Sequence, residues 1–514
     1  MPLHPLARST ARLLLLAAIA AAPLAAQLSE AFDAVLPLPP AAGAFERYGF
    51  RVAIGDYDDD GLDDVAAVGF GYIAGQPDAG SLRTMRGQAP HGLCCDNVLL
   101  GAPGDRLGEG LAFGDFDDDG RDELAVGRPG RTVNGLAEAG DVVILRPALL
   151  GGGFVELSTW SQATVGIAGG AEAGDQFGSA LAVGDFNHDG VDDLAIGVPL
   201  EDVGSIIAAG AVQVIYGAAG VGLVVTGNAL FHEDSPNVAG TAEQPDRLGT
   251  VLTTGDITCD GFDDLIIGVP FEGDGALVQV GAVLVLPGSD DGLTGVGSFE
   301  IDQTEFGASA EEYDRFGDAV VVGRLSNSLF TCSTLVIGAP GEDIGSIIAA
   351  GAVFLYRDGP VEIWDEQDVG GEVDELDRFG ASLAIADFDG DGKRDIAIGI
   401  PNDNGVVPLP HQGSVRIVAH DSNGTLDPAG SRILSPRPGV AAYDNANGGT
   451  ISGFGAALAA GKLNGDSLAD LIVGMPDSDL GGFNNIGGVE VVFSAFFAED
   501  FEGNDLLEWS ATAP

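Results

Sequence analysis

Six aspartates lie within ten residues in the segment GDYDDDGLDD, residues 55–64. Closely similar acidic spacing returns at residues 114–123, 184–193, 255–264 and 386–395. Carboxylates at alternate positions of a tight turn can converge on one point, and a hard cation such as Ca²⁺ takes about six to eight oxygen ligands at flexible geometry. The repeated segment therefore predicts a Ca²⁺-binding loop, in which the metal offsets the charge of the aspartates.

In each loop we expect side chains at positions 1, 3, 5 and 9 to bind the cation, together with the backbone carbonyl of position 7. Glycine at position 6 permits the backbone conformation that the turn requires. The expected ligands, loop by loop, are Asp56, Asp58, Asp60, Leu62 and Asp64; Asp115, Asp117, Asp119, Arg121 and Glu123; Asp185, Asn187, Asp189, Val191 and Asp193; Asp256, Thr258, Asp260, Phe262 and Asp264; and Asp387, Asp389, Asp391, Lys393 and Asp395.

The loops are not equally complete, which predicts about four or five Ca²⁺ ions. Thr258 replaces a carboxylate in the fourth loop, so we expect weaker binding there. The fifth unit has Arg324 at the first position and no carboxylate, and the seventh has Lys462 there, so both are expected to be empty. A single loop of this kind could be an Asx-rich turn on a solvated face, but four nearly complete copies disfavour that interpretation.

The elements that position these loops also repeat, about every 60 to 75 residues. Each loop is preceded by an apolar-Gly pair and followed by a short apolar run that mostly ends in Gly-x-Pro, and then by a β-branched segment such as GAVQVIYG, residues 210–217. These short, Gly-bounded runs are typical of strands, which excludes the helix-flanked EF-hand. The seven apolar-Gly pairs are Tyr48-Gly49, Leu107-Gly108, Phe177-Gly178, Leu248-Gly249, Phe316-Gly317, Phe379-Gly380 and Phe454-Gly455.

Four strands in each of seven units predict an all-β fold, a seven-bladed β-propeller of four-stranded antiparallel blades over residues 27–496. The acidic loops then join the first and second strands of their blades. The last unit ends after its third strand, so we expect residues 31–37 to supply its missing outer strand. An acidic tail, residues 497–514, follows the propeller, and the sequence assigns it no role.

Phe-Gly, DxDxDGxxD and Gly-Ala-Pro in this order resemble the FG-GAP repeats of the integrin α-subunit propeller and of similar bacterial exported proteins. The resemblance covers about residues 30–496. It implies a seven-bladed propeller, Ca²⁺ in the loops between first and second strands, and a binding role on the opposite face. The degenerate fifth and seventh loops, and Val68-Gly69-Phe70 in place of Gly-x-Pro, depart from the pattern.

Charge and composition limit the classes of molecule that this protein is expected to bind. The formal net charge is −56, from 22 Lys plus Arg against 78 Asp plus Glu, and no basic cluster occurs to contact phosphates. Residues 1–26 have the basic and apolar regions of a secretory signal peptide, and no later apolar run is long enough to span a bilayer. We therefore expect an exported protein, periplasmic or extracellular or at the cell surface, without nucleic-acid binding or membrane insertion.

Four cysteines in an exported chain are compatible with disulfides. Cys94 and Cys95 are adjacent and could form a vicinal bridge, whereas Cys259 and Cys332 occupy similar places in neighbouring repeats. Both pairings stay open.

The leading functional hypothesis is a non-catalytic recognition or adhesion propeller that binds an extracellular protein or a glycan; its oligomeric state is not indicated. No GxSxG or HExxH motif occurs. A propeller-type polysaccharide lyase or hydrolase, and a structural scaffold of a cell-surface assembly, are the alternatives. The twin GSIIAAG segments, residues 204–210 and 345–351, could be exposed contact points, but we expect them to pack against a neighbouring blade.

Overall fold

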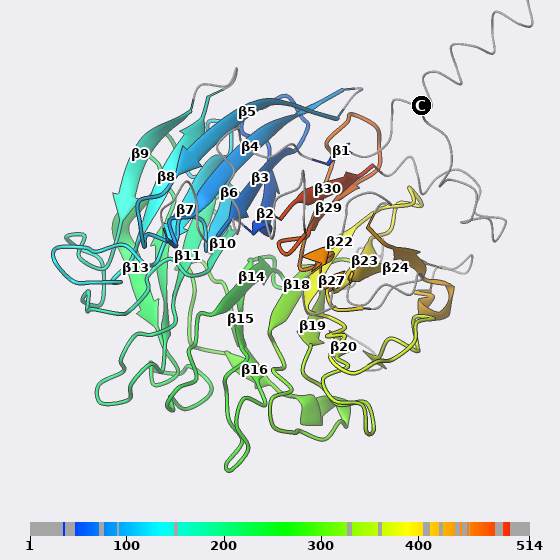
Figure 1. The fold of residues 1–514 in the computed structure, drawn as a ribbon. Coiled ribbons are helices and arrows are strands. Elements are labelled where there is room, and N and C mark those ends of the chain that lie inside the picture. The colour runs from blue at the N-terminus through cyan, green and yellow to red at the C-terminus, as the bar shows by residue number, and fades with distance from the viewer. Residues whose placement is uncertain are drawn as a thin grey trace, which may run out of the picture.

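The structure is a computed structural model, and it describes residues 34–35, 47–70, 77–89, 92–148, 153–325, 332–357, 362–403, 412–420, 425–436, 443–444, 450–451, 453–478 and 487–493. These residues form seven four-stranded antiparallel sheets arranged around a central axis (Figure 1). The predicted all-β, seven-bladed propeller is therefore confirmed. The expected signal peptide and acidic tail lie outside the described residues.

The first four blades follow the chain order from their first to their fourth strands. They are β2 (Tyr48–Gly55), β3 (Asp64–Gly69), β4 (Ser81–Gln88) and β5 (Gly92–Leu100); β6 (Leu111–Gly114), β7 (Glu123–Arg128), β8 (Asp141–Pro147) and β9 (Phe154–Trp160); β10 (Leu181–Gly184), β11 (Asp193–Val198), β12 (Ala211–Tyr216) and β13 (Val224–Phe231); and β14 (Val251–Gly255), β15 (Asp264–Val269), β16 (Ala282–Leu286) and β17 (Phe299–Ile301).

The last three blades continue the pattern, and the first strands of neighbouring blades contact one another around the whole ring. The blades are β18 (Ala319–Gly323), β19 (Thr334–Ala339), β20 (Ala352–Tyr356) and β21 (Glu362–Trp364); β22 (Ser382–Ala386), β23 (Asp395–Ile400), β24 (Ser414–Val418) and β25 (Arg432–Leu434); and β28 (Ala457–Gly461), β29 (Asp470–Gly474), β30 (Val489–Val492) and β1 (Ala34–Val35). Outside the blades lie the 3₁₀ helices η1 (Gln303–Phe306) and η2 (Pro428–Gly430) and the hairpin of β26 (Tyr443–Asp444) and β27 (Thr450–Ile451).

The ring is closed by the N-terminal segment. Strand β1 pairs antiparallel with β30, with Ala34 opposite Val491, and completes the seventh blade beside the last strands of the chain (Figure 1). The expectation that residues 31–37 supply the missing outer strand is confirmed by these two residues. Closure of this kind joins the two ends of the propeller through backbone hydrogen bonds.

The core lies between blades. Strand β11 is buried along its whole length, and alternate residues face opposite neighbours. Leu194 and Ile196 pack with residues of the second blade, whereas Ala195 packs with residues of the fourth. The second strands are thus apolar on both sides, which explains why the runs after each acidic loop lack alternation.

The apolar-Gly pair and the Gly-x-Pro motif allow neighbouring blades to approach closely. Phe177 is fully buried, and Gly178 follows it with φ +92°. A Cβ at Gly127, in the Gly-x-Pro motif of the second blade, would lie 1.8 Å from the carbonyl oxygen of Gly178 in the third. A side chain at position 127 would therefore force the two blades apart.

One of the two disulfides considered from the sequence is present in the structure. Cys259 and Cys332 form a disulfide between the fourth and fifth blades, 73 residues apart in the chain. The alternative bridge involves Cys95, whose side chain lies outside the described residues. None of the helices in the described residues has the length and apolar composition needed to cross a bilayer.

Candidate metal loops

The five acidic segments occupy the predicted place between first and second strands. In the first blade Gly55, the last residue of β2, pairs with Asp64, the first residue of β3, and the loop lies between them. The same Gly-acid pairing closes the second, third and fourth loops, and Ala386 replaces the glycine in the sixth. The residue at position 2 is buried in the core in the loops with Tyr57, Phe116, Phe186 and Phe388.

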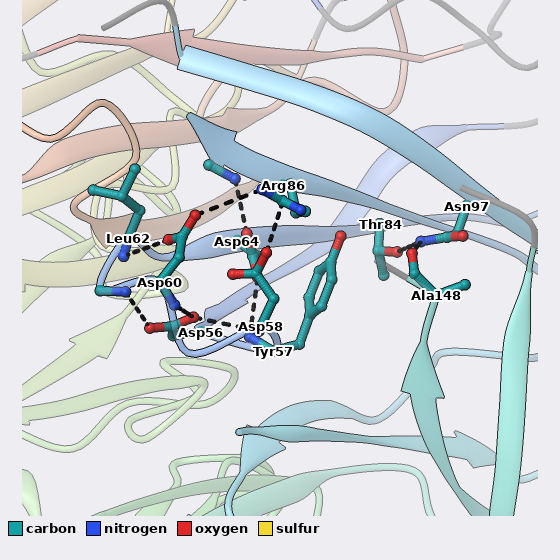
Figure 2. A network of polar contacts seen from close by, with 12 residues as sticks. Asp56, Tyr57, Asp58, Asp60, Leu62, Asp64, Thr84, Arg86, Asn97 and Ala148 are labelled. Atoms are coloured by element: carbon teal, nitrogen blue, oxygen red, sulfur yellow. Dashed lines mark hydrogen bonds and ion pairs between the residues drawn. The ribbon is translucent and has the colours of Figure 1, made fainter. Parts of the chain in front are cut away.

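Hydrogen bonds within the first loop hold its carboxylates inward (Figure 2). The carboxylate of Asp56 accepts from the backbone N–H of Gly61 at 2.8 Å and of Asp60 at 3.2 Å. That of Asp64 accepts from Tyr57 at 2.9 Å and from Gly87, in β4, at 2.8 Å. Backbone amides thereby fix the first and ninth positions relative to each other before any cation binds.

The other loops repeat this pattern. In the third loop Asp185 accepts from the amides of Asp189 and Gly190, and Asp193 accepts from Phe186 and Gly217. In each of the five loops the first acid accepts from the amide at position 5 or 6 and the ninth acid accepts from the amide at position 2, which gives the loops one common frame.

The ninth position is the buried one. Asp64, Asp193 and Asp395 have no exposed surface, and burial raises the pKa of each to about 8. Nearby carboxylates of the same loops raise these pKa values further, and burial likewise raises the pKa of Glu123 to about 7. A cation between the carboxylates would favour their ionised forms, because opposite charge offsets both effects.

Three loops bring carboxylate oxygens together as a divalent cation needs. The ligand atoms lie within 4.8 Å of one another in the groups Asp56, Asp58 and Asp64; Asp115, Asp117 and Glu123; and Asp387, Asp389 and Asp395. In each group one buried oxygen has no hydrogen-bond partner, namely Oδ1 of Asp58, Asp117 or Asp395. Hard oxygen donors with such free atoms fit Ca²⁺.

The third and fourth loops keep the frame with fewer carboxylates. Asn187 at position 3 donates to Asp189 at 3.1 Å and its Oδ1 accepts from the amide of Asp189. Thr258, through its backbone N–H, donates to Asp264 at 2.9 Å. Val191 and Phe262, whose backbone carbonyls are predicted ligands, lie two residues after the aspartates at position 5. The backbone N–H of each donates to the carboxylate of that aspartate.

In two loops the carboxylates pair with an arginine from the third strand of the same blade, a contact that the sequence analysis did not predict. Arg86, at the end of β4, lies 2.8 Å from Asp58 and 3.7 Å from Asp60 (Figure 2). Arg146, in β8, lies 3.3 Å from Asp117 and 3.2 Å from Asp119, and also pairs with Glu123. The sequence did contain a signal, because both arginines hold the same place near the end of a third strand, just before Gly87 and Pro147. Only the fold brings that place next to the acidic loop.

The sixth loop has its own basic neighbours. The ammonium of Lys393 lies 2.8 Å from Asp391, and that ion pair lowers the pKa of Asp391. Nδ1 of His420 lies 3.6 Å from Asp395. Among the loops expected to be empty, Arg324 and Lys462 are exposed, and the fifth loop beyond Leu325 lies outside the described residues until Cys332.

Adjacent loops are joined by the residue at position 8, which sequence reasoning left without a role. The carboxylate of Asp192 accepts from the amide of Asp115 at 2.9 Å, and that of Asp263 accepts from Asp185 at 3.2 Å. Asp63 accepts from Lys462 at 2.6 Å and thereby connects the first loop with the seventh. The paired acids at positions 8 and 9 were the available signal.

Comparisons with known proteins agree with this architecture. The pattern that defines the FG-GAP repeat matches residues 107–145, 177–215, 248–286 and 379–418, in the second, third, fourth and sixth blades. Phosphatidylinositol-glycan-specific phospholipase D of Rattus norvegicus is 32% identical over 248 residues, 48% of this chain and 27% of that enzyme. Integrin alpha-PS2 of Drosophila melanogaster is 26% identical over 259 residues, 50% of this chain and 16% of the integrin.

The chain thus spans less than a third of either relative. Among solved structures, a rhamnogalacturonan lyase is similar with a TM-score of 0.42 and 13% identity, over 90% of this chain and 76% of the lyase. The repeat matches and the seven blades lead to one conclusion. The chain contains FG-GAP repeats in four of its blades, and its seven-bladed propeller resembles that of the integrin α subunits.

Proposed function

We propose that this protein is an exported, Ca²⁺-stabilised recognition propeller that binds an extracellular protein through the face opposite the acidic loops, without catalysis. Antiparallel strands send successive connections to opposite ends of a blade. The connections between second and third strands, and those that enter each first strand, therefore share that face.

The observation that carries the proposal is a set of exposed apolar side chains on these connections, which we call the apolar rim. Val278 is 45% and Tyr313 54% exposed, and the amide of Tyr313 donates to the carbonyl of Val278 at 3.1 Å. Leu376 is 52% and Ile348 57% exposed, joined in the same way at 2.9 Å. Two side-by-side apolar pairs on consecutive blades favour a protein partner. The apolar rim consists of Ile207, Val278, Tyr313, Ile348 and Leu376.

The twin GSIIAAG segments contribute to the rim. Ile207, in the first copy, is 55% exposed, and Ile348, in the second copy, is 57% exposed. The expectation that these segments pack against neighbouring blades was therefore wrong for the second isoleucine of each copy. The physical reason is a tight hairpin: Val203 bridges to Ile206, and Ile344 to Ile347, which leaves the following residue at the outside.

Ca²⁺ would serve structure in this proposal. About four or five ions in the first, second, third, fourth and sixth loops would offset part of the −56 charge, whose self-repulsion opposes the compact state. The frames described above would supply carboxylates and the carbonyls of position 7. We expect chelator to lower the melting temperature of the mature protein and Ca²⁺ to restore it.

The test is binding of the mature protein to arrays of purified extracellular proteins and of glycans, with Ca²⁺ or with chelator. A protein hit that is lost in the triple variant Tyr313→Ser, Ile348→Ser, Leu376→Ser supports the proposal. Val155→Ser, which removes an exposed valine from outer strand β9, is the matched control and should leave binding unchanged. Glycan hits alone, or protein hits that survive the triple variant, would refute recognition of a protein through the apolar rim.

The similarity to a phospholipase D covers 27% of that enzyme, so its activity is assigned to no residue of this chain. A lyase or hydrolase would instead turn over a polysaccharide in the Ca²⁺-loaded state. Release of oligosaccharides by the mature protein would contradict the non-catalytic part of the proposal.

A further inference from the structure

Three polar side chains meet between neighbouring blades on the face opposite the acidic loops. One follows the outer strand of a blade, one precedes the apolar-Gly pair of the next blade, and one follows its Gly-x-Pro motif. Between the second and third blades these are Gln162, Asp175 and Glu201, and the amide of Gln162 donates to Glu201 at 2.7 Å. The glutamine thereby gives one carboxylate of the acidic pair a hydrogen-bond donor.

The same arrangement recurs between the fourth and fifth blades. There the amide of Gln303, which is fully buried, donates to Asp314 at 3.0 Å, and Glu342 is the third member. Between the fifth and sixth blades glutamate replaces the glutamine, as Glu366, but Arg416 of β24 lies 3.4 Å from its carboxylate. In each of these three places the chain supplies an amide or a guanidinium.

The crevice between the third and fourth blades is different. Glutamate again replaces the glutamine, as Glu233, beside Asp246 and Glu272, and ligand atoms of all three lie within 4.8 Å of one another. The position of Arg416 is taken here by Leu284: Leu284 pairs with Ile267 in β15 as Arg416 pairs with Ile398 in β23. An apolar side chain therefore stands where the crevice between the fifth and sixth blades has the guanidinium of Arg416.

Glu233 is deeply buried, and one of its carboxylate oxygens has no hydrogen-bond partner. Only 6% of its surface is exposed, and its Oε2 makes no hydrogen bond. Oε2 of Glu272 is also buried and without a hydrogen bond. A Cβ on Gly240 would lie 3.1 Å from the carboxyl carbon of Glu233, so the backbone at Gly240 covers this carboxylate.

The electrostatic surroundings add more negative charge. Burial, followed by the charges of Glu233, Asp246, Glu300 and Glu243, raises the pKa of Glu272 to about 9. Burial and neighbouring carboxylates raise the pKa of Glu233 to about 8. A buried charge is tolerated when it is paired or coordinates a metal.

We propose that Glu233, Asp246 and Glu272 bind a divalent cation, Ca²⁺, between the third and fourth blades, at a site separate from the acidic loops. Three carboxylates offer up to six oxygens, which suits a hard cation of high coordination number. The ion takes the place that Arg416 holds between the fifth and sixth blades and that the amides of Gln162 and Gln303 hold in the other two crevices. It joins the outer end of the third blade to two connections of the fourth.

Glu233→Gln is the direct test, because it reproduces the Gln-Asp-Glu set that the propeller already accommodates at Gln303 and Gln162. Ca²⁺ bound per chain is measured on the metal-free mature protein by equilibrium dialysis at pH 8, and melting temperatures are recorded with Ca²⁺ and with chelator. We expect Glu233→Gln and Glu272→Gln each to bind one ion fewer than the wild type. Both should retain the melting temperature of the wild type, or exceed it, in chelator.

Asp234→Asn is the matched control, because Asp234 is exposed and next to Glu233 in the chain. It removes the same charge without entering the crevice and should leave the ion count unchanged. An unchanged ion count in Glu233→Gln or in Glu272→Gln would overturn the proposal, and so would loss of an ion in Asp234→Asn. The loop frames contain none of these residues, so the result is independent of how many loops bind Ca²⁺.

Discussion

The carboxylate of Asp122 in the second blade accepts a hydrogen bond of 2.8 Å from the backbone N–H of Asp56, the first residue of the acidic loop in the first blade. The amide of Asp122 in turn donates to the carbonyl of Asp56 at 3.0 Å. Each acidic loop joined in this way is therefore shaped partly by the next blade. A cation bound in one loop would therefore be coupled to blade packing through these two hydrogen bonds.

Asp122→Ala should lower the free energy of unfolding by about 1–3 kcal/mol, because it leaves the amide of Asp56 without a partner in a partly buried site. It should also weaken Ca²⁺ binding to the first loop, since Asp56 is the first of the predicted ligands. Urea unfolding and Ca²⁺ titration measure the two effects. Asp118→Asn, at an exposed position of the second loop, is the control; an equal loss in both variants would contradict a specific contact.

The disulfide should replace the missing contact between the fourth and fifth loops. The residue at position 8 in the fifth blade is Ser333, whose amide donates to the carbonyl of Asp256 at 3.3 Å but which has no carboxylate. Cys332, next to it, is linked to Cys259 of the fourth loop. The double variant Cys259→Ser, Cys332→Ser should lose about 2–5 kcal/mol. If reductant leaves the urea midpoint of the wild type unchanged, this role is excluded.

Arg146→Ala tests whether the guanidinium of Arg146 would compete with Ca²⁺ for the carboxylates of the second loop. Its guanidinium pairs with Asp117, Asp119 and Glu123, where Ca²⁺ would bind. Without it we expect Ca²⁺ affinity at this loop to rise about tenfold, which is about 1.4 kcal/mol, and stability in chelator to fall. Arg131→Ala, which breaks an ion pair with Asp105 away from the acidic loops, should change stability without changing affinity. Unchanged or weaker Ca²⁺ binding in Arg146→Ala would refute the competition.

Glu342→Gln should reduce the pH dependence of stability. Burial raises the pKa of Glu342 to about 8, well above the value of about 4.3 in an unfolded chain. Between these values the unfolded state binds fewer protons than the folded state, so stability falls as pH rises. The variant lacks this titration and should be more stable than the wild type at pH 8, with a smaller difference at pH 5. Thermal unfolding at both pH values measures this, and a difference independent of pH would contradict it.

The periodic spacing of the loops, strands and glycines was enough to predict the propeller, because blades repeat one local unit and strand order within a blade follows the chain. The place and turn of the acidic loops followed from the same spacing, since hydrogen bonds such as that from Gly61 to Asp56 are made within a few residues; the ligand positions stay a prediction. The closing strand could be predicted by elimination, because one blade lacked a strand and one segment lacked a place.

Contacts between blades could not be predicted in this way. Arg86 enters its loop from a strand more than twenty residues away, and Asp122 reaches a loop 66 residues earlier. Equivalent places in the third strands hold Arg416 in the sixth blade and Leu284 in the fourth. Only the packing of adjacent blades reveals that Glu233, unlike Glu366, has no arginine at that place. The sequence alone determined the repeated unit, because its hydrogen bonds are local; the tertiary structure decided how the charges of neighbouring units are paired, because those pairs form only when the ring closes.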